Sequence, residues 1–380
     1  METVLAAVVL AGMAWYLMTL VAVFRRLSPS RRARRASPPL DLPSVTILKP
    51  IKGVDSDLED NLLSFIRQDY PSFEVVFGIQ DPFDPALPTL RRIRDAHPEV
   101  PVRIVQTLET PGFNPKVNNL LGMMRMASHD VMVISDSNVR VSPSYLSENV
   151  PLLLRPGAGL VCNLIRGRGD AGLGSLMESL HLNTFLLGNT CLVDRLAGEK
   201  IVVGKSIFFR KSELDSLGGL AKLKDVLAED YLMGRLYLDA GRDVAVSAHV
   251  IDTWTRGWGV RQFLSRHARW ARLRWQINRT AYVLEFLTNA PFWATVLALV
   301  SGFSAPALAV AVSAFLVKGA GDQLCNLRLG RPVRSGLVLL SPLKDVVVAA
   351  IFPVPLVSSH TNWRGNRLRI TRGTVLVPAR

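Results

Sequence analysis

The alternation of hydrophobic and polar residues divides the chain into apolar ends and a mixed central region. Residues 3–24 form an uncharged run of about 22 residues, which is enough to span a bilayer as a helix. Residues 281–357 hold further apolar stretches, whereas residues 44–255 alternate short β-branched runs with amphipathic ones. Alternating strands and helices are typical of an α/β domain with a parallel sheet. The pattern therefore predicts an α/β domain flanked by membrane segments.

Within the mixed region the periodicity predicts a regular series of elements. A short strand is expected to run from Asp130 to just before Asp136. The other strands are predicted at residues 45–51, 74–81, 102–106, 159–166, 201–210 and 244–251. Helices are predicted at residues 57–68, 85–97, 116–127, 143–154, 173–196, 211–217, 228–240 and 260–278.

The first apolar segment, residues 1–24, is predicted to be an uncleaved transmembrane anchor. A cleaved signal peptide is the competing interpretation, but it requires a positively charged start and a small-residue cleavage site. Here Glu2 begins the segment and the positive charge follows Phe24. By the positive-inside rule, these arginines place the α/β domain in the cytoplasm, at the inner membrane in a bacterium. Residues 25–43 are predicted to be a basic linker to the cytoplasmic domain of residues 44–255.

The C-terminal part is predicted to return to a multi-pass membrane arrangement. Residues 256–280 interleave arginines with aromatic residues, the pattern of an amphipathic helix at a membrane interface; a solvated basic face with tryptophan packed inward is compatible with it. Residues 281–357 are expected to contain two spans joined near Gly302, followed by a re-entrant or in-plane hairpin. A full crossing by that hairpin would leave the basic tail, residues 358–380, outside the cytoplasm, against the charge rule.

Charge and cysteine content narrow the classes of partner. The net charge is +14, and six arginines lie in residues 25–35 and seven in residues 256–279. Both stretches adjoin apolar segments, which favours an anionic membrane surface over nucleic acid, and no nucleic-acid partner is expected. The three cysteines and six histidines show no metal-binding spacing. Neither a disulfide framework nor a zinc site is predicted.

Acidic residues follow two of the predicted strands and open one predicted helix. Asp81 and Asp136 come at strand ends, and Glu229 and Asp230 come in a first helical turn. Each position has an ordinary structural explanation, because acids cap helices and stabilise their N-termini. Two acids at one edge of a parallel sheet nevertheless indicate a polar pocket, in which a carboxylate can hold a divalent metal or a sugar hydroxyl.

Residues 45–275 contain a series of short motifs in a fixed order. These motifs are LKPIKGVD (48–55), QDYP (68–71), QD (80–81), GFNPKVNNL (112–120), SDSNVRV (135–141), AEDY (228–231) and RHARW (266–270). With these motifs in this order, the chain resembles the ceramide glucosyltransferases, membrane enzymes with a glycosyltransferase-A (Rossmann-like) catalytic fold.

This resemblance implies roles for individual residues. Asp81 is expected to contact the nucleotide, Asp136 to hold the diphosphate and a Mg²⁺ or Mn²⁺ ion, and Asp230 to be the catalytic base. Two lysines of the motifs, Lys49 and Lys116, are expected to bind the nucleotide-sugar. Three residues of the last motif are expected to shape the diphosphate and acceptor end of the site: Arg266, Arg269 and Trp270. His181 stands roughly where the family has a histidine near the nucleotide.

One departure from the family pattern concerns the metal. Asn138 stands where a full DxD motif has its second acid, so the metal is expected to have a single direct carboxylate, that of Asp136.

The activity implied by the resemblance is inverting transfer of a sugar from a UDP-sugar to the primary hydroxyl of ceramide, and the first candidate for that sugar is glucose. The alternatives are another lipid alcohol such as a hopanoid, a growing polysaccharide, or a non-catalytic scaffold that binds anionic membrane lipids.

Overall fold

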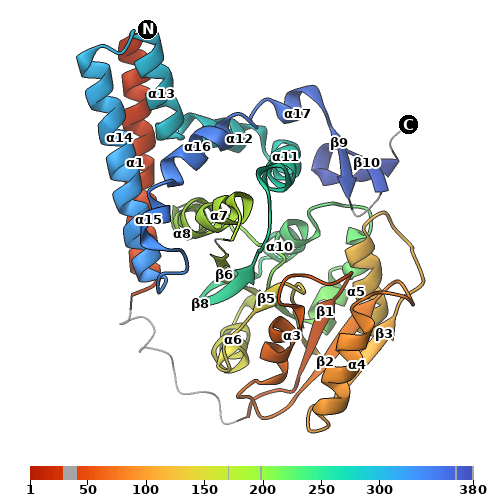
Figure 1. Cartoon of the computed structure of the whole chain (residues 1–380). Helices are drawn as coiled ribbons and strands as arrows, with labels where there is room; N and C mark the ends of the chain where they lie inside the picture. Colours follow the sequence, from red (N-terminus) through yellow and green to blue (C-terminus); the bar gives the residue numbers. More distant parts are fainter. Residues whose placement is uncertain (29–40, 170, 197–198, 364–365, 379–380) are drawn as a thin grey trace. The chain divides into compact units, whose positions relative to one another are not determined.

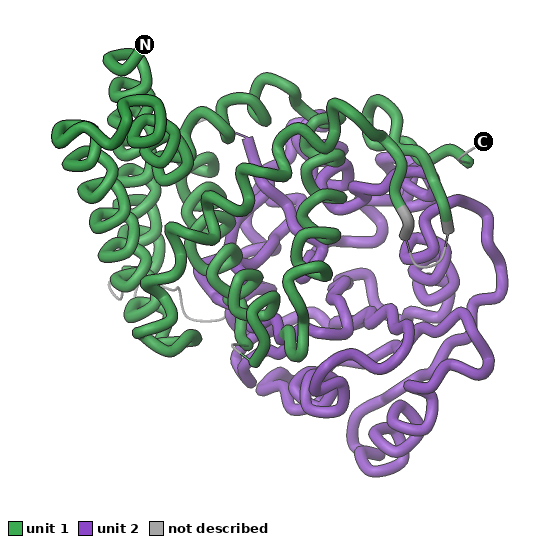
Figure 2. Tube along the Cα trace, turned by 45° about the horizontal axis from the view of Figure 1, so that its top comes forward, with its two compact units in different colours: residues 1–33, 166–198, 255–380 green, residues 34–165, 199–254 purple. Residues whose placement is uncertain are grey.

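The structure is a computed structural model, and its elements are shown in Figure 1. It describes residues 1–28, 41–169, 171–196, 199–363 and 366–378. The chain forms two compact units (Figure 2). Unit 1 comprises residues 1–33, 166–198 and 255–380, and unit 2 comprises residues 34–165 and 199–254. Most of the predicted linker, residues 25–43, lies outside the described residues. Residues 166–198, which the sequence grouped with the α/β domain, belong to unit 1.

Among the described residues, eight strands form one mixed sheet in the order β3-β2-β1-β4-β7-β6-β8-β5. The four strands β3, β2, β1 and β4 run parallel, as the alternating pattern predicted. Strand β7 is antiparallel to both β4 and β6. The strands are β1 (Val45–Pro50), β2 (Phe73–Ile79), β3 (Val102–Gln106), β4 (Val131–Ile134), β5 (Val139–Arg140), β6 (Ala158–Arg168), β7 (Ile207–Arg210) and β8 (Asp243–Trp254).

The helices of unit 2 connect these strands, and the start of one of them, α5, matters for the site. Asn114 caps α5 by accepting a hydrogen bond from the backbone N–H of Val117 at 3.1 Å, and Pro115 occupies the first turn, where its missing N–H costs nothing. The helices are α3 (Leu58–Ile66), α4 (Leu87–Ala96), α5 (Pro115–Arg125), α6 (Tyr145–Leu153), α9 (Lys211–Ser216), the short 3₁₀-helix η2 (Leu220–Leu223) and α10 (Glu229–Asp239).

The core of unit 2 lies around the parallel strands. Every residue of β4 is buried, and Ile47 and Leu48 of the neighbouring β1 have no exposed surface. Burial on both faces explains why β4 is a continuous apolar run and not an alternating one. Because β1, β2 and β4 are parallel, their carboxyl ends meet at one edge of the sheet, and the residues that follow them gather there.

Unit 1 is mostly helical. A six-residue π-helix, η1, interrupts the predicted helix of residues 173–196. The helices are α1 (Glu2–Arg26), α7 (Leu173–Leu180), η1 (His181–Leu186), α8 (Leu187–Leu196), α11 (Val260–Ile277), α12 (Arg279–Leu287), α13 (Ala290–Val300), α14 (Ala305–Arg328), α15 (Ser335–Val338), α16 (Ser341–Ala349) and α17 (Val354–Val357).

Within the part of the chain that the structure describes, three segments are long and apolar enough to cross a membrane: α1, α14 and residues 335–357. Helices α12 and α13 form a fourth candidate if they count as one span bent by 57°. Helices α1, α13 and α14 lie side by side (Figure 1). The predicted turn near Gly302 is present between α13 and α14. Residues 335–357 contain three short helices, and their re-entrant path stays a prediction.

The predicted basic tail contains regular structure that the sequence analysis did not anticipate. Strands β9 (His360–Trp363), β10 (Asn366–Ile370) and β11 (Leu376–Pro378) form an antiparallel sheet, with a 3₁₀ turn, η3 (Arg372–Thr374), before β11. Leu368 and Ile370 are buried, whereas Arg367 and Arg369 are exposed. This alternation with a period of two was the available signal for a strand.

Candidate active site

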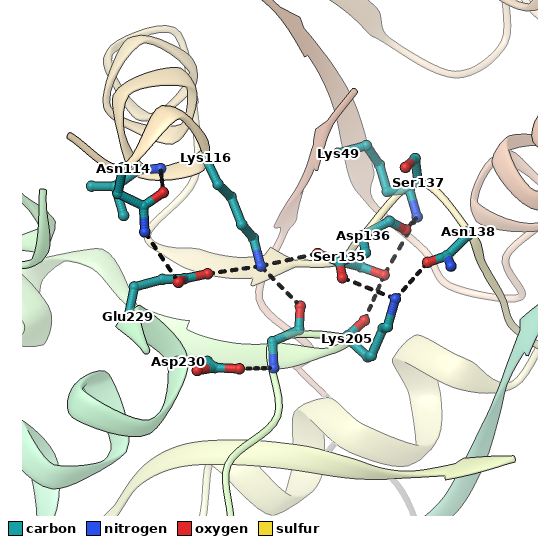
Figure 3. Close-up of polar contacts among 12 residues, drawn as sticks. Lys49, Asn114, Lys116, Ser135, Asp136, Ser137, Asn138, Lys205, Glu229 and Asp230 are labelled. Carbon is teal, nitrogen blue, oxygen red and sulfur yellow. Dashed lines mark hydrogen bonds and ion pairs between the residues drawn. The ribbon is translucent and has the colours of Figure 1, made fainter. Parts of the chain in front are cut away.

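Asp136 is the second residue after β4, and its carboxylate lies at the centre of a network of charged side chains in unit 2 (Figure 3). Its Oδ1 lies 2.9 Å from Nζ of Lys116, and its Oδ2 lies 3.1 Å from Nζ of Lys205. Burial by itself would raise the pKa of Asp136, but the two ammonium groups outweigh burial and hold this pKa below its usual range. Asp136 is therefore ionised at neutral pH.

Lys116, in the first turn of α5, connects Asp136 to the acids at the start of α10. Its Nζ lies 3.0 Å from Oε1 of Glu229 and donates to the carbonyl oxygen of Gly204 at 3.3 Å. Burial acts to lower the pKa of Lys116, but the carboxylates of Asp136, Glu229 and Asp230 raise it above its usual value. The ammonium group thus stays charged between two elements that are distant in sequence.

Asn114 holds Glu229 in place from the other side. Its Nδ2 donates to Oε2 of Glu229 at 3.2 Å and to the carbonyl oxygen of Val226 at 2.8 Å. The same side chain caps α5 through its oxygen, so a single asparagine fixes the start of α5 against the start of α10 (Figure 3). Lys116 and Glu229 are thereby positioned before any ligand binds.

Asp230 faces the same network from the first turn of α10. Its Oδ2 accepts a hydrogen bond from the N–H of Gly204 at 2.6 Å, and its Oδ1 accepts one from the N–H of Tyr231 at 2.8 Å. Burial, followed by the nearby charge of Glu229, raises the pKa of Asp230 to about 6. Asp230 is thus ionised at neutral pH, yet more basic than an ordinary aspartate.

The segment before β7 approaches this network closely at Gly204. A Cβ at Gly204 would lie 2.8 Å from Nζ of Lys116 and 3.1 Å from Oδ2 of Asp230. The predicted strand of residues 201–210 was therefore too long: β7 begins only at Ile207, because the preceding residues turn toward the charged side chains.

Lys49 lies beneath the end of β4 and has no exposed surface. Its ammonium group donates to the carbonyl oxygen of Asp136 and to Oγ of Ser135 at 3.4 Å, and it lies 3.7 Å from the ring centroid of Phe65. Burial lowers the pKa of Lys49. These contacts support the backbone that presents Asp136. Direct contact of Lys49 with a nucleotide-sugar stays a prediction.

Asp81 is exposed and follows β2 at the same edge of the sheet. Its carboxylate accepts a hydrogen bond from the N–H of Phe83 at 2.9 Å. Strands β2 and β4, which precede Asp81 and Asp136, flank β1 and are therefore about 10 Å apart, two strand spacings. The predicted contact of Asp81 with the nucleotide remains a prediction.

In unit 1, the buried carboxylate of Glu178 organises the RHARW segment of α11. Its Oε1 lies 3.1 Å from Nε of Arg266, and its Oε2 lies 2.9 Å from Nε2 of His267. The guanidinium of Arg266 also lies over the ring of Trp270, 4.6 Å from its centroid. Burial lowers the pKa of His267, and the charge of Glu178 opposes that shift. Arg269 is on the same helix and is partly buried. The catalytic roles predicted for these α11 residues stay predictions.

The amino-acid sequence matches a known family along nearly its whole length. The model of glycosyl transferase family 21 matches residues 4–376. The chain belongs to glycosyl transferase family 21. The motifs from LKPIKGVD to RHARW had indicated this family, and the match confirms it.

Curated relatives of this family 21 chain are ceramide glucosyltransferases. Ceramide glucosyltransferase 1 of Caenorhabditis elegans is 30% identical over 280 residues, which cover 72% of this chain and 58% of the relative. The ceramide glucosyltransferase of Komagataella phaffii is 31% identical over 226 residues, which cover 53% of this chain and 44% of the relative. The chain thus spans about half the length of these curated relatives.

A solved structure with the same fold is the mannosyltransferase PcManGT from Pyrobaculum calidifontis in complex with GDP-Man and Mn²⁺. The TM-score is 0.54 at 19% identity, and the match covers 93% of this chain and 98% of the mannosyltransferase. This likeness confirms the predicted glycosyltransferase-A type of α/β fold. It concerns the fold alone.

Three charged residues of the family 21 chain take part in these clusters without having been assigned a site role from the sequence. Lys205 pairs with Asp136, Glu229 pairs with Lys116, and Glu178 pairs with Arg266. Glu178 had a usable signal, since it is the only acid in the predicted helix of residues 173–196 apart from one near its end. Lys205 had none, because nothing local distinguishes it from a surface lysine.

The oxygen donors around Asp136 are few, and this bears on the metal expected at this site. Among the described residues, no group of three or more His, Cys, Asp or Glu side chains could hold a metal ion. Asp136 offers one carboxylate, and Oδ1 of Asn138 accepts a hydrogen bond from Lys205 at 2.6 Å. Mg²⁺ and Mn²⁺ are often bound by one or two carboxylates together with substrate phosphates and water. The donor set therefore fits an ion held mainly by a diphosphate, with Asp136 as its protein ligand.

Proposed function

We propose that this family 21 chain is an inverting glycosyltransferase that moves glucose from UDP-glucose to the primary hydroxyl of ceramide. The product would be a β-linked glycosphingolipid. The observation that carries the proposal is the network in which Lys116 joins Asp136 to Glu229, with Asp230 beside them at the carboxyl edge of the parallel strands. In open α/β sheets ligands bind at this edge.

The first requirement of the reaction is to stabilise the leaving group. A nucleoside diphosphate gains negative charge as its bond to the sugar breaks, and fixed cations nearby lower the free energy of that transition state. Lys116 and Lys205 provide two such cations, each held by the carboxylate of Asp136. The three donors of Lys116 are already directed at Asp136, Glu229 and the carbonyl oxygen of Gly204, so a ligand phosphate would take the place of one of these acceptors.

A divalent ion would be bound by Asp136, with the amide oxygen of Asn138 as a second candidate ligand. When bound, Mg²⁺ or Mn²⁺ would supply further charge neutralisation at the diphosphate oxygens. Because Asn138 stands in place of the second acid of a full DxD motif, Lys116 and Lys205 would neutralise a larger share of the negative charge on the diphosphate.

The second requirement is a base for the acceptor. A primary alcohol is too weakly acidic to ionise at neutral pH, so a positioned carboxylate must take its proton during attack. Asp230 meets this requirement because its raised pKa makes it a stronger base and its backbone hydrogen bonds fix both oxygens. Each oxygen accepts a single one of these bonds, which leaves room for the acceptor hydroxyl.

The stereochemical outcome follows from a single displacement. The hydroxyl attacks the anomeric carbon opposite the leaving diphosphate, so an α-linked donor gives a β-linked product.

The remaining residues of the site have supporting roles in this proposal. Asp81 and Lys49 contribute to binding of the nucleotide-sugar. The diphosphate and acceptor end of the site is shaped by Arg266, Arg269 and Trp270. The α/β domain faces the cytoplasm, as the arginines after the first apolar segment favour.

A donor and acceptor panel tests the proposal. Purified full-length chain in lipid vesicles is incubated with Mn²⁺ or Mg²⁺, ceramide, and in turn UDP-glucose, UDP-galactose, UDP-glucuronate and UDP-N-acetylglucosamine. We expect UDP release and a glycolipid whose anomeric proton shows the β configuration by NMR. A retained α linkage would contradict the one-step mechanism. Transfer to a hopanoid or another lipid alcohol, but not to ceramide, would contradict the acceptor, and no turnover with any pair would support the scaffold alternative.

A further inference from the structure

Unit 1 contains a cavity of about 90 Å³ between its candidate spans and the helices that carry His181 and His267. Its lining comes from α1, η1, α8, α11, α12, α13, α14 and α16. Most of the lining is aromatic or aliphatic, including Trp15, Phe185, Ala271, Tyr282, Phe286 and Val317. A cavity of this size admits a few polar groups of a ligand but not long alkyl chains.

One wall of the cavity carries a buried polar side chain whose hydrogen-bonding capacity is not used. His181 is 1% exposed, and among the described residues neither of its ring nitrogens has a hydrogen-bond partner. Its ring instead contacts the rings of Phe185 and His267, with centroids 4.7 Å and 4.3 Å away. Leaving a buried donor or acceptor unpaired costs about 1–3 kcal/mol, and a ligand that supplies the missing partner would remove this cost.

Another wall carries charges that already neutralise one another. Lys318 of α14 forms ion pairs with Asp322, one turn further along, and with Asp345 of α16, the latter at 3.1 Å. The hydroxyl of Tyr16 on α1 donates to Asp322 at 2.8 Å. Charged residues inside candidate membrane spans are costly and face the bundle interior, where they mark functional sites. The paired charges give the cavity a polar wall without a net charge to attract an anion.

We propose that this cavity binds the polar end of the lipid acceptor, with the imidazole of His181 hydrogen-bonded to its amide or hydroxyl groups. The ligand class is a long-chain amide alcohol, and the inference rests on the proposed ceramide glycosyltransferase function. Its alkyl chains exceed the volume of the cavity, so they lie along the apolar faces of the candidate spans. Leu10, Leu17 and Leu316 are exposed on α1 and α14 and provide such a face.

The chemistry of the cavity favours this occupant over a nucleotide. A nucleoside diphosphate requires unpaired cations and backbone donors, whereas Lys318 is held by two carboxylates and the lining is mainly apolar. A neutral lipid head with both donors and acceptors satisfies an imidazole in either tautomer. An amphipathic ligand also matches a cavity whose walls are helices apolar enough to cross a bilayer.

The first experiment compares His181→Phe with the same substitution at an exposed position, His360→Phe. Phenylalanine keeps an aromatic ring of similar shape and removes only the nitrogens. We expect the half-saturating mole fraction of ceramide in vesicles to rise by about tenfold in H181F, the loss that one buried hydrogen bond explains. The KM for the UDP-sugar and the thermal unfolding temperature should match those of H360F. A rise in the KM for the UDP-sugar with unchanged ceramide dependence would overturn the proposal.

A second experiment measures binding without turnover. Full-length protein in phosphatidylcholine vesicles is photolabelled with a ceramide that carries a diazirine next to its amide, and the labelled peptides are mapped by mass spectrometry. We expect labels on residues that line the cavity, competition by unlabelled ceramide but not by extra phosphatidylcholine, and several-fold weaker labelling in H181F. Labelling that is confined to other segments would overturn the proposal.

A cavity-narrowing variant covers the case in which H181F does not fold. Ala349 lines the cavity and is 5% exposed, whereas Ala298 of α13 is similarly buried and does not line it. Ala349→Val should weaken photolabelling, and Ala298→Val should not. Labelling that is equal in both variants would contradict the proposal. If the labelling pattern is as expected but the wild-type chain glycosylates no ceramide, the lipid site stands and the proposed reaction fails.

Discussion

The polar cluster around Asp136 in unit 2 and the cluster around Glu178 in unit 1 satisfy their charges in different ways. The side chain of Asp136 is 28% exposed and pairs with two lysines, of which Lys116 is shared with Glu229. Glu178 is 1% exposed and pairs with Arg266 and His267. It lies in a region where the ring nitrogens of His181 have no hydrogen-bond partner among the described residues.

This difference indicates different ligands for the two clusters. A paired network that is open to solvent can exchange one partner for a phosphate when an anion arrives, because solvent compensates the charges during the exchange. A dry cluster cannot reorganise so cheaply. It suits a neutral ligand that adds a hydrogen bond without moving a charge. The network in unit 2 therefore suits binding of an anionic phosphate, and the cluster in unit 1 suits recognition of a neutral lipid.

The largest effect is expected at Asp230. Replacing it by asparagine removes the base and keeps the shape, so kcat should fall by about 10² to 10⁴, the range for a lost general base. Binding of UDP should be unchanged in calorimetry. Asp239→Asn, at the exposed end of the same helix, is the matched control and should retain wild-type activity. A loss of UDP binding in D230N that equals its loss of kcat would show that the residue serves the donor site and not proton transfer.

The second effect tests whether the network of unit 2 holds the donor. Lys116→Met leaves two partly buried carboxylates without their shared cation, so the Kd for UDP should rise by about 10- to 100-fold. The free energy of unfolding should fall by about 1–3 kcal/mol. Lys116→Arg keeps the charge but not the geometry and should give an intermediate result. Lys211→Met removes an exposed ion pair with Asp215 and should change neither quantity. Wild-type affinity in K116M would contradict the role of this lysine.

The pH dependence of kcat/KM tests the role of Asp230 in the network of unit 2. Because the pKa of Asp230 is about 6, kcat/KM should fall about tenfold from pH 7 to pH 5 as the base becomes protonated. Stability should respond in the opposite direction. A carboxyl whose pKa is raised on folding stabilises the folded state fully below its unfolded pKa, near 4, and loses that contribution as the pH rises through 6. If the residual kcat/KM of D230N fell in the same way between pH 7 and pH 5, the group that titrates would be another one and not Asp230.

The smallest effect on rate is expected at Glu178, which acts through Arg266. Glu178→Gln removes the charge that holds the guanidinium but keeps a hydrogen-bonding side chain of similar size. We expect kcat to fall by only about three- to tenfold, since one positioning interaction is weakened, and the midpoint of thermal unfolding to drop. Glu59→Gln, which breaks an exposed pair with Arg92, is the control. A loss in E178Q as large as that in D230N would place Glu178 in the chemistry itself.

Local patterns predicted most of the secondary structure of unit 2. Strands β1, β2, β3 and β4 and helices α3 to α6 lie within a few residues of their predicted positions, because burial on both faces produced short β-branched runs and burial on one face produced amphipathic helices. The shorter β7 was missed because its neighbouring segment turns to meet Lys116 and Asp230. The sheet of β9, β10 and β11 was not predicted, because the arginines of this segment indicate a basic tail.

The sequence by itself determined the fold class, the apolar segments and three acids in an ordered set of motifs, since these depend on periodicity and on residue type at fixed spacing. Only the tertiary structure decided which charges meet. Lys205 becomes the second partner of Asp136, Glu178 becomes the anchor of Arg266, and His181 comes to line a largely apolar cavity. Such contacts join segments far apart in the chain, and their energies depend on burial, which no local pattern encodes. The role of Asp136 therefore rests on two lysines as much as on its own motif.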